Sequence, residues 1–116
     1  DTTNRFYGDN RVSGPDADHG THVAGIIAAM RRNELGMDGI ALNARIMVLR
    51  AVPSGDERDK DVANAIRYAV DNGAKIINMS FGKSYSPQPE LVQAAVAYAR
   101  SKDVLIVHAA GNDAQD

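Results

Sequence analysis

Apolar runs with the length of strands alternate with helical patterns along this chain of 116 residues. Three runs are almost continuously apolar, at residues 45–52, 75–80 and 104–108. A helical pattern, with apolar residues three and four positions apart, precedes each run, at residues 19–32, 59–72 and 90–100. Parallel strands joined by helices form sheets whose two faces are both covered by helices. The sequence therefore predicts a three-layer α/β fold with a parallel sheet.

Polar segments between these patterns predict where the elements end. Residues 1–18 are rich in Gly, Asn and Asp, which predicts a loop with a short strand near residues 5–7. Asp18 stands where the N-cap of the first helix is expected. The other predicted breaks are Gly36 and Gly39, Pro53-Ser54-Gly55, Asn72-Gly73 and residues 83–89.

Composition excludes several classes of protein and of site. Thirteen basic and fifteen acidic side chains give a net charge of −2, which argues against a nucleic-acid binder that neutralises phosphates. The absence of cysteine excludes disulfides, thiolate metal sites and cysteine nucleophiles. No apolar run reaches about 18 residues, so no membrane-spanning helix is predicted. The polar start Asp1-Thr2-Thr3-Asn4 carries no signal peptide and is expected of a piece from inside a longer protein.

The first candidate site is His19-Gly20-Thr21-His22-Val23-Ala24-Gly25, where the first helical pattern begins. Histidines three residues apart share a helix face and could bind a metal ion, but no carboxylate lies between them as in H-E-x-x-H. A neutral imidazole could instead serve as a general base near pH 7. His22, one turn inside the helix, is expected to pack structurally. For His19 alone, catalysis and packing both stay open.

Two further candidate sites follow the second and third predicted strands. Ala109-Ala110-Gly111-Asn112 is typical of a turn, but its carboxamide could also donate to an oxyanion that develops at the strand end. Asn78-Met79-Ser80-Phe81-Gly82 is either a plain turn or an exposed edge that pairs with an extended peptide. Function is expected at these positions, because the carboxyl ends of parallel strands meet at one edge of the sheet.

In this order and spacing, the three motifs resemble those of the subtilisin-like serine proteases, or subtilases. Residues 19–25 are similar to the family's histidine motif, 78–82 to its substrate-binding strand and 109–112 to its oxyanion motif. The resemblance runs from about Gly14 to Asn112. It implies the subtilisin-like three-layer α/β/α fold, present incompletely. It also implies that residues 1–116 are the central part of a catalytic domain truncated at both ends.

The resemblance implies a role for each matching residue. His19 would be the triad histidine, which takes the proton of the nucleophile and passes it to the leaving amine. Asn112 would donate its side-chain amide to the oxyanion. The residues implied to contact substrate are Ser80, Phe81 and Gly82 along its backbone, and Ala109, Ala110 and Gly111 in the primary specificity pocket. Phe81 and His108 could tune that pocket, although a structural role is expected for His108.

Two members of the triad have no counterpart in this sequence. The family's aspartate follows an apolar strand, and Asp1 has no strand before it. The other early acids, which lie in loop sequence, are Asp9, Asp16 and Asp18. No serine stands in a Gly-Thr-Ser motif followed by a helix of small residues. The sequence therefore predicts part of a serine endopeptidase that is inactive alone, because a lone triad histidine gives essentially no turnover.

Alternatives from other classes stay open. A parent protein without its nucleophile would be a non-catalytic peptide-binding module, which the downstream sequence would distinguish. A nucleotide-binding domain is disfavoured, because no glycine-rich phosphate loop follows a strand. No cofactor is predicted. A structural calcium ion in the parent protein is not decided, since residues 33–39 offer no acid-rich ligand set.

The expected partner is a polypeptide substrate and not a nucleic acid. We also expect self-association, because an incomplete sheet exposes a strand edge to other chains. The family resemblance, rather than any residue of this chain, implies a secreted or otherwise extracytoplasmic protein.

Overall fold

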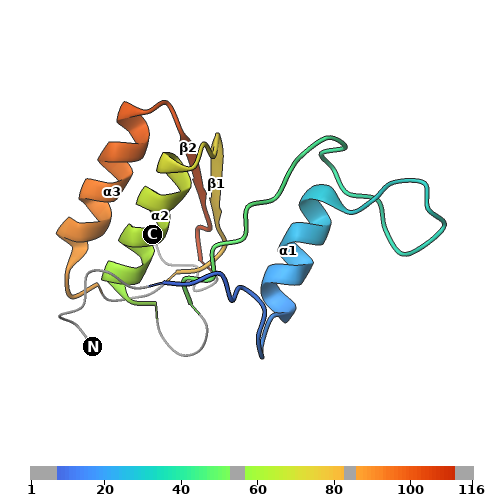
Figure 1. The fold of residues 1–116 in the computed structure, drawn as a ribbon, viewed down its shortest axis with the longest axis horizontal. Coiled ribbons are helices and arrows are strands. Elements are labelled where there is room, and N and C mark those ends of the chain that lie inside the picture. Colours follow the sequence, from blue (N-terminus) through green and yellow to red (C-terminus); the bar gives the residue numbers. More distant parts are fainter. Residues whose placement is uncertain (1–7, 53–56, 83–85, 112–116) are drawn as a thin grey trace.

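The computed structural model describes residues 8–52, 57–82 and 86–111. Figure 1 shows the order of its helices and strands. They are α1 (Asp18–Ala28), α2 (Asp59–Asp71), β1 (Ile76–Met79), α3 (Pro89–Ser101) and β2 (Leu105–His108). From α2 onward, the observed elements differ from the predicted ranges by no more than one residue at either end.

β1 and β2 form a two-stranded parallel sheet. The register pairs Ile76 with Leu105 at one end and Met79 with His108 at the other. Parallel neighbours need a crossover connection, and α3 provides it in a βαβ unit. The α/β class with parallel strands, as the sequence predicts, is confirmed.

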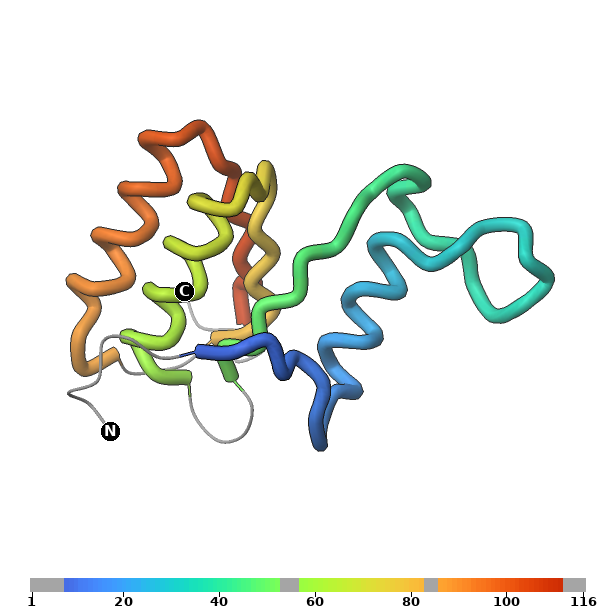
Figure 2. Tube along the Cα trace, viewed as in Figure 1, coloured from blue at the N-terminus to red at the C-terminus, as the bar shows by residue number. Residues whose placement is uncertain are grey.

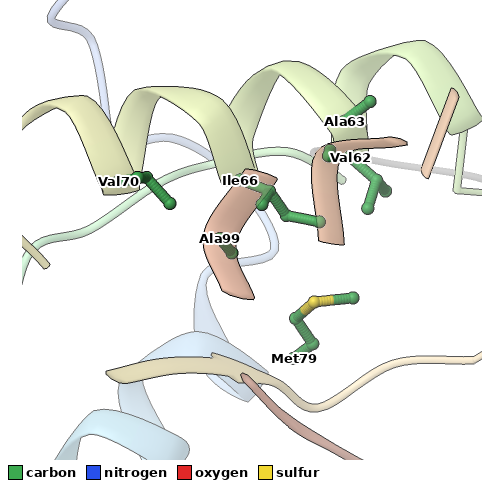
Figure 3. Close-up of a cluster of buried hydrophobic side chains, with 7 residues drawn as sticks. Val62, Ala63, Ile66, Val70, Met79 and Ala99 are labelled. Carbon is green, nitrogen blue, oxygen red and sulfur yellow. The ribbon is translucent and has the colours of Figure 1, made fainter. Parts of the chain in front are cut away.

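The hydrophobic core lies between α2, α3 and one face of the strands. The buried side chains in contact are Val62, Ala63, Ile66 and Val70 of α2, Ala95 and Ala99 of α3, and Met79 of β1. Figure 3 shows this cluster, with Met79 beneath the stripe that α2 presents. The α2 residues recur at helical spacing, and the alanines of α3 are small enough to let the two helices approach closely. The pair of helices therefore covers one face of the sheet.

The opposite face of the two strands is exposed. Ile77 and Ile106 pack toward the core, because alternate residues of a strand point to opposite faces. Large apolar side chains point the other way, with exposed fractions of 62% for Ile76, 58% for Leu105 and 47% for Val107. Figure 1 shows α1 on this side of the strands but apart from them. The extensive contacts between described elements join α2 with α3, β1 with β2 and α3 with β2, and none involves α1.

The strand predicted at residues 45–52 is not a strand in the described part of the chain, so this prediction is wrong. Figure 2 shows these residues, in green, as a connection that leads from the α1 region toward α2. Ile46, Met47 and Val48 are exposed along it. A strand is held by ladder hydrogen bonds from a neighbour, and within the described residues only β1 and β2 pair in this way.

α1 begins and ends earlier than the sequence predicts. Asp18 is its first residue and not its N-cap, so that prediction is wrong. The cap is Ala17, whose carbonyl accepts a hydrogen bond from the Thr21 hydroxyl at 2.8 Å. The helix stops at Ala28, because the chain returns and satisfies its last carbonyls. These bonds run from the N–H groups of Gly39, Ile40 and Ala41 to the carbonyls of Ala29, Ile26 and Ile27, at 3.0, 3.0 and 2.7 Å.

Replacing Gly39 with alanine is expected to lower the free energy of unfolding by about 1–3 kcal/mol. A Cβ there would lie 2.3 Å from the Ala29 nitrogen and 2.7 Å from the Ala28 carbonyl carbon. Both are backbone atoms, so the returning chain would have to move away from α1. Chemical denaturation measures the loss. The matched control is Gly25→Ala, whose Cβ position has nothing within 4 Å, and an equal loss in both variants would contradict the argument.

α2 and α3 end in the same capping arrangement before their strands. Gly73 has φ +87°, and the amides of Gly73 and Ala74 donate back to the last turn of α2. This confirms the helix end predicted at Asn72-Gly73. Asp103 takes the corresponding place after α3 with φ +58°, and its amide also donates back into its helix. Equivalent turns therefore lead the chain into β1 and β2.

Candidate functional site

The two segments predicted to contact substrate leave adjoining strands at the same edge of the sheet. Residues 80–82 follow β1 and residues 109–111 follow β2, and the two strands are parallel. Pairing continues one step further, because the Ala109 N–H donates to the Met79 carbonyl at 3.2 Å. The carboxyl edge of a parallel sheet is where α/β proteins carry their sites. The structure therefore brings these two segments together.

Side chains also connect the two strand ends. The side-chain amide nitrogen of Asn78 donates to Ser80 Oγ at 2.8 Å. The half-buried Phe81 ring packs against the core and meets the His108 ring edge-on, with centroids 6.1 Å apart and planes at 90°. This edge-to-face geometry is favourable for aromatic rings. His108 thus packs against the segment that follows the neighbouring strand.

The backbone of both segments is accessible at its outer end. The exposed residues are Gly82, Ala109, Ala110 and Gly111. Gly111 has φ +90°, a conformation that residues with side chains rarely adopt, so the chain turns there. Asn112, the predicted oxyanion donor, comes next in the sequence and lies outside the described residues. Exposed backbone at a sheet end is suited to pairing with an extended peptide.

His19 is the second residue of α1 and is exposed. His22, one turn further along, is also exposed and not packed among the described residues. Figure 1 shows the first turn of α1 at the same end of the molecule as the carboxyl ends of the strands, but set apart from them. The described structure therefore does not pack the His19 helix against the strand-end segments.

Arg50 fixes the loop that leads into α1, a contact that no motif of the sequence indicates. Its Nη2 donates to the carbonyl of Pro15 at 2.6 Å. A Cβ on Gly14 would lie 2.9 Å from Arg50 Nη1, so the guanidinium lies directly against this loop. The two bonded residues are 35 positions apart, and no local pattern predicts such a contact.

A second unpredicted contact joins the starts of α2 and α3. Asp59, the first residue of α2, is only 4% exposed. Its carboxylate accepts hydrogen bonds from the Ser86 hydroxyl at 2.5 Å and from the Gln88 N–H at 2.8 Å. From the sequence, Asp59 is only an acidic residue that suits the start of a helix. Its burial depends on residues 27 and 29 positions away.

The pKa shifts resolved among the described groups lie outside the strand-end segments. A hydrogen bond from the Arg11 side chain lowers the pKa of Asp9, and the same bond raises the pKa of Arg11. The Tyr98 hydroxyl donates to Asp71, which raises the pKa of Tyr98 because the bond needs the protonated phenol. That bond links α3 to α2 at the surface.

Within residues 8–52, 57–82 and 86–111, no three His, Cys, Asp or Glu side chains come close enough to hold a metal ion. The histidine pair of α1 therefore has no third ligand of these types among the described residues. None of the helices that the structure describes has the length and apolar character needed to cross a membrane.

The family match and similar known proteins both point to proteases. The sequence profile of the subtilase family matches residues 1–116. A thermophilic serine proteinase of Bacillus sp. (strain AK1) is 45% identical over 96 residues, which cover 82% of this chain and 23% of the relative. Thermitase of Thermoactinomyces vulgaris is 44% identical over 95 residues, or 81% of this chain and 33% of thermitase.

The cell wall-associated protease of Bacillus subtilis (strain 168) is 41% identical over 117 aligned residues, which cover 100% of this chain and 13% of that protein. The chain thus spans between 13% and 33% of the length of these three curated relatives.

Proposed function

Because this chain belongs to the subtilase family, we propose that it forms part of a serine endopeptidase that hydrolyses peptide bonds. The curated relatives are several times longer than this chain, so the activity is proposed for the longer protein. The chain contributes the triad histidine, one oxyanion donor and the segments that bind substrate.

His19 is the general base of the proposed reaction. Its imidazole takes the proton of the serine hydroxyl as that oxygen attacks the peptide carbonyl, and then gives the proton to the leaving amine. Asn112 donates a side-chain N–H to the oxyanion of the tetrahedral intermediate. Support for both roles comes from the motifs in which these residues stand, 19–25 and 109–112.

The observation that carries the proposal is the juxtaposition of the two strand-end segments, whose outer residues are exposed. Substrate backbone pairs with Ser80, Phe81 and Gly82 in the proposed complex. The substrate side chain before the scissile bond lies against Ala109, Ala110 and Gly111. The Ala109–Met79 hydrogen bond and the Phe81–His108 ring contact support a fixed spacing between these segments.

The triad aspartate and the nucleophilic serine are proposed to come from other parts of the longer protein. No aspartate or serine of these 116 residues stands in the corresponding motif of the family. The residues of a triad act as a unit, so the 116-residue chain alone should give essentially no turnover.

The test compares the full-length protein with the 116-residue chain on casein and on a chromogenic peptide. We expect hydrolysis by the full-length protein that a sulfonyl fluoride abolishes, and none by the chain alone. Inhibitor-sensitive hydrolysis by the chain alone would contradict the proposed division of the triad. Saturable peptide binding by the full-length protein without hydrolysis would replace the enzyme with a peptide-binding module.

We also propose that the protein acts outside the cytoplasm. One relative that aligns with the whole chain is named as a cell wall-associated protease. Fractionation of cells that express the full-length protein tests this, and recovery of all of it from the cytoplasm would contradict it.

Self-association of the 116-residue chain is expected through the open sheet. The two strands have unpaired edges within the described residues, beside the exposed face of Ile76, Leu105 and Val107. Sedimentation velocity should show larger species as the concentration rises, and Leu105→Lys should reduce them. Leu91→Lys, a similar change on the exposed surface of α3, is the control. A strictly monomeric profile at high concentration would rule out this association.

A further inference from the structure

One carboxylate holds the first turns of two helices together. Asp59 is the one buried charged residue in the described part of the chain. One of its oxygens accepts the Ser86 hydroxyl and the other accepts the backbone N–H of Gln88. Gln88 is the N-cap residue of α3, so a side chain of α2 binds the start of α3. No buried side-chain polar atom is without a partner among the described residues.

The hydrogen bonds of the Asp59 carboxylate to Ser86 and Gln88 are expected to hold these residues firmly. A buried carboxylate is strongly unfavourable unless hydrogen bonds satisfy it, and bonds to an ionised acceptor are stronger than neutral ones. The positive ends of the α2 and α3 dipoles both favour a negative charge at this point. The backbone that carries Asp59 is also fixed, because Val62 and Ala63 in the next turn of α2 belong to the hydrophobic core.

The same tether lies just beyond the segment proposed to pair with substrate. Residues 80–82 are held at their start by β1 and by the Asn78–Ser80 hydrogen bond. Ser86 follows Gly82 by four residues, which can span at most about 14 Å. Asp59 therefore binds the chain at a residue no more than about 14 Å from Gly82. Residues 80–82 therefore lie in the chain between two points that described contacts fix, β1 before them and Ser86 after them.

We propose that Asp59 is a positioning residue, which limits the movement of the substrate segment by fixing Ser86 and Gln88 beyond its far end. The inference rests on the proposed function. A peptide that pairs along residues 80–82 needs a backbone edge held in one place, because a slip of one residue in the pairing turns every side chain to the opposite face. Binding of the substrate residues far from the scissile bond depends most on this edge. A substrate with a single acylated residue before the scissile bond does not reach along it.

The test uses the full-length protein and two substrates with the same leaving group, one with four residues before the scissile bond and one with a single acylated residue. Asp59→Ala should lower kcat/KM on the longer substrate about tenfold, mainly by raising KM. On the short substrate, kcat/KM should change less than about twofold. Asp59→Asn keeps an acceptor oxygen for Gln88 and should restore most of the loss.

Asp61→Ala is the matched control, because Asp61 carries the same charge in the same helical turn and forms an ion pair with Lys60 at 3.8 Å. It should leave both substrates nearly unchanged. An equal loss on the two substrates in Asp59→Ala, or the same length-dependent loss in Asp61→Ala, would overturn the positioning role. If Asp59→Ala does not fold, Ser86→Ala removes one donor and carries the same expectation.

Amide exchange separates the tether from the peptidase. The Gln88 amide should exchange about tenfold faster in Asp59→Ala than in the wild type, and unchanged exchange would overturn the tether itself. If the wild-type protein hydrolyses neither substrate, the proposed function fails and the positioning role fails with it, whatever the exchange shows. Faster exchange together with a length-dependent loss of kcat/KM supports the whole inference.

Discussion

Replacing His19 with alanine in the full-length protein is expected to lower kcat by about 10⁶-fold. That magnitude is the one known for removal of a triad residue from a subtilisin. The reason is that the serine hydroxyl then has no base to take its proton, and the leaving amine has no acid to protonate it. Single-turnover and steady-state assays on a chromogenic peptide measure the loss.

His22→Ala is the control for this experiment. Both histidines are exposed and lie within one turn of each other on α1, so the two variants disturb the helix similarly. We expect His22→Ala to keep kcat within about tenfold of the wild type. A large loss in His22→Ala with activity retained in His19→Ala would transfer the base to His22 and contradict the assignment.

The second large effect is expected from Asn112→Ala, which should lower kcat by about 10²–10³-fold and leave KM nearly unchanged. This range was also established on a subtilisin, so it is a family value. The carboxamide is proposed to bind an oxyanion that exists only after attack, and such an interaction stabilises the transition state without helping substrate to bind.

Asn72→Ala is the matched carboxamide deletion away from the strand ends. Asn72 is the C-cap of α2, and its side chain donates to the Tyr68 carbonyl. Its loss should affect stability and not kcat. A rise in KM with unchanged kcat in Asn112→Ala would show that Asn112 binds ground-state substrate instead of the oxyanion.

Elements whose signals are local were predicted closely. α2 shows its buried stripe at helical spacing and its Gly73 cap in the sequence itself, and β1 and β2 are short apolar runs between recognisable turns. Their parallel pairing followed from the helix between them, because a crossover of that length joins parallel neighbours. The meeting of residues 80–82 with 109–111 was predictable for the same reason.

Elements that depend on distant residues were not predicted. The apolar run at 45–52 satisfies every local criterion for a strand, yet strand formation depends on a neighbour that local sequence does not specify. The early end of α1 depends on Gly39 and the residues after it, which return from outside the helix. Arg50 and Asp59 each bind residues 27 or more positions away, so their roles were visible only in three dimensions.

Because Gly39 bonds back to the end of α1, the chain between Ala29 and Gly39 can vary in length at little cost. The hydrogen bonds that end the helix join residues 39–41 to carbonyls of residues 26–29, so residues 30–38 form a loop whose two ends are already held together. For such a closed loop, doubling the number of residues costs only about 0.6 kcal/mol of closure entropy. Insertions at this point should therefore be among the best tolerated in the chain, because they leave both pinned ends where they are.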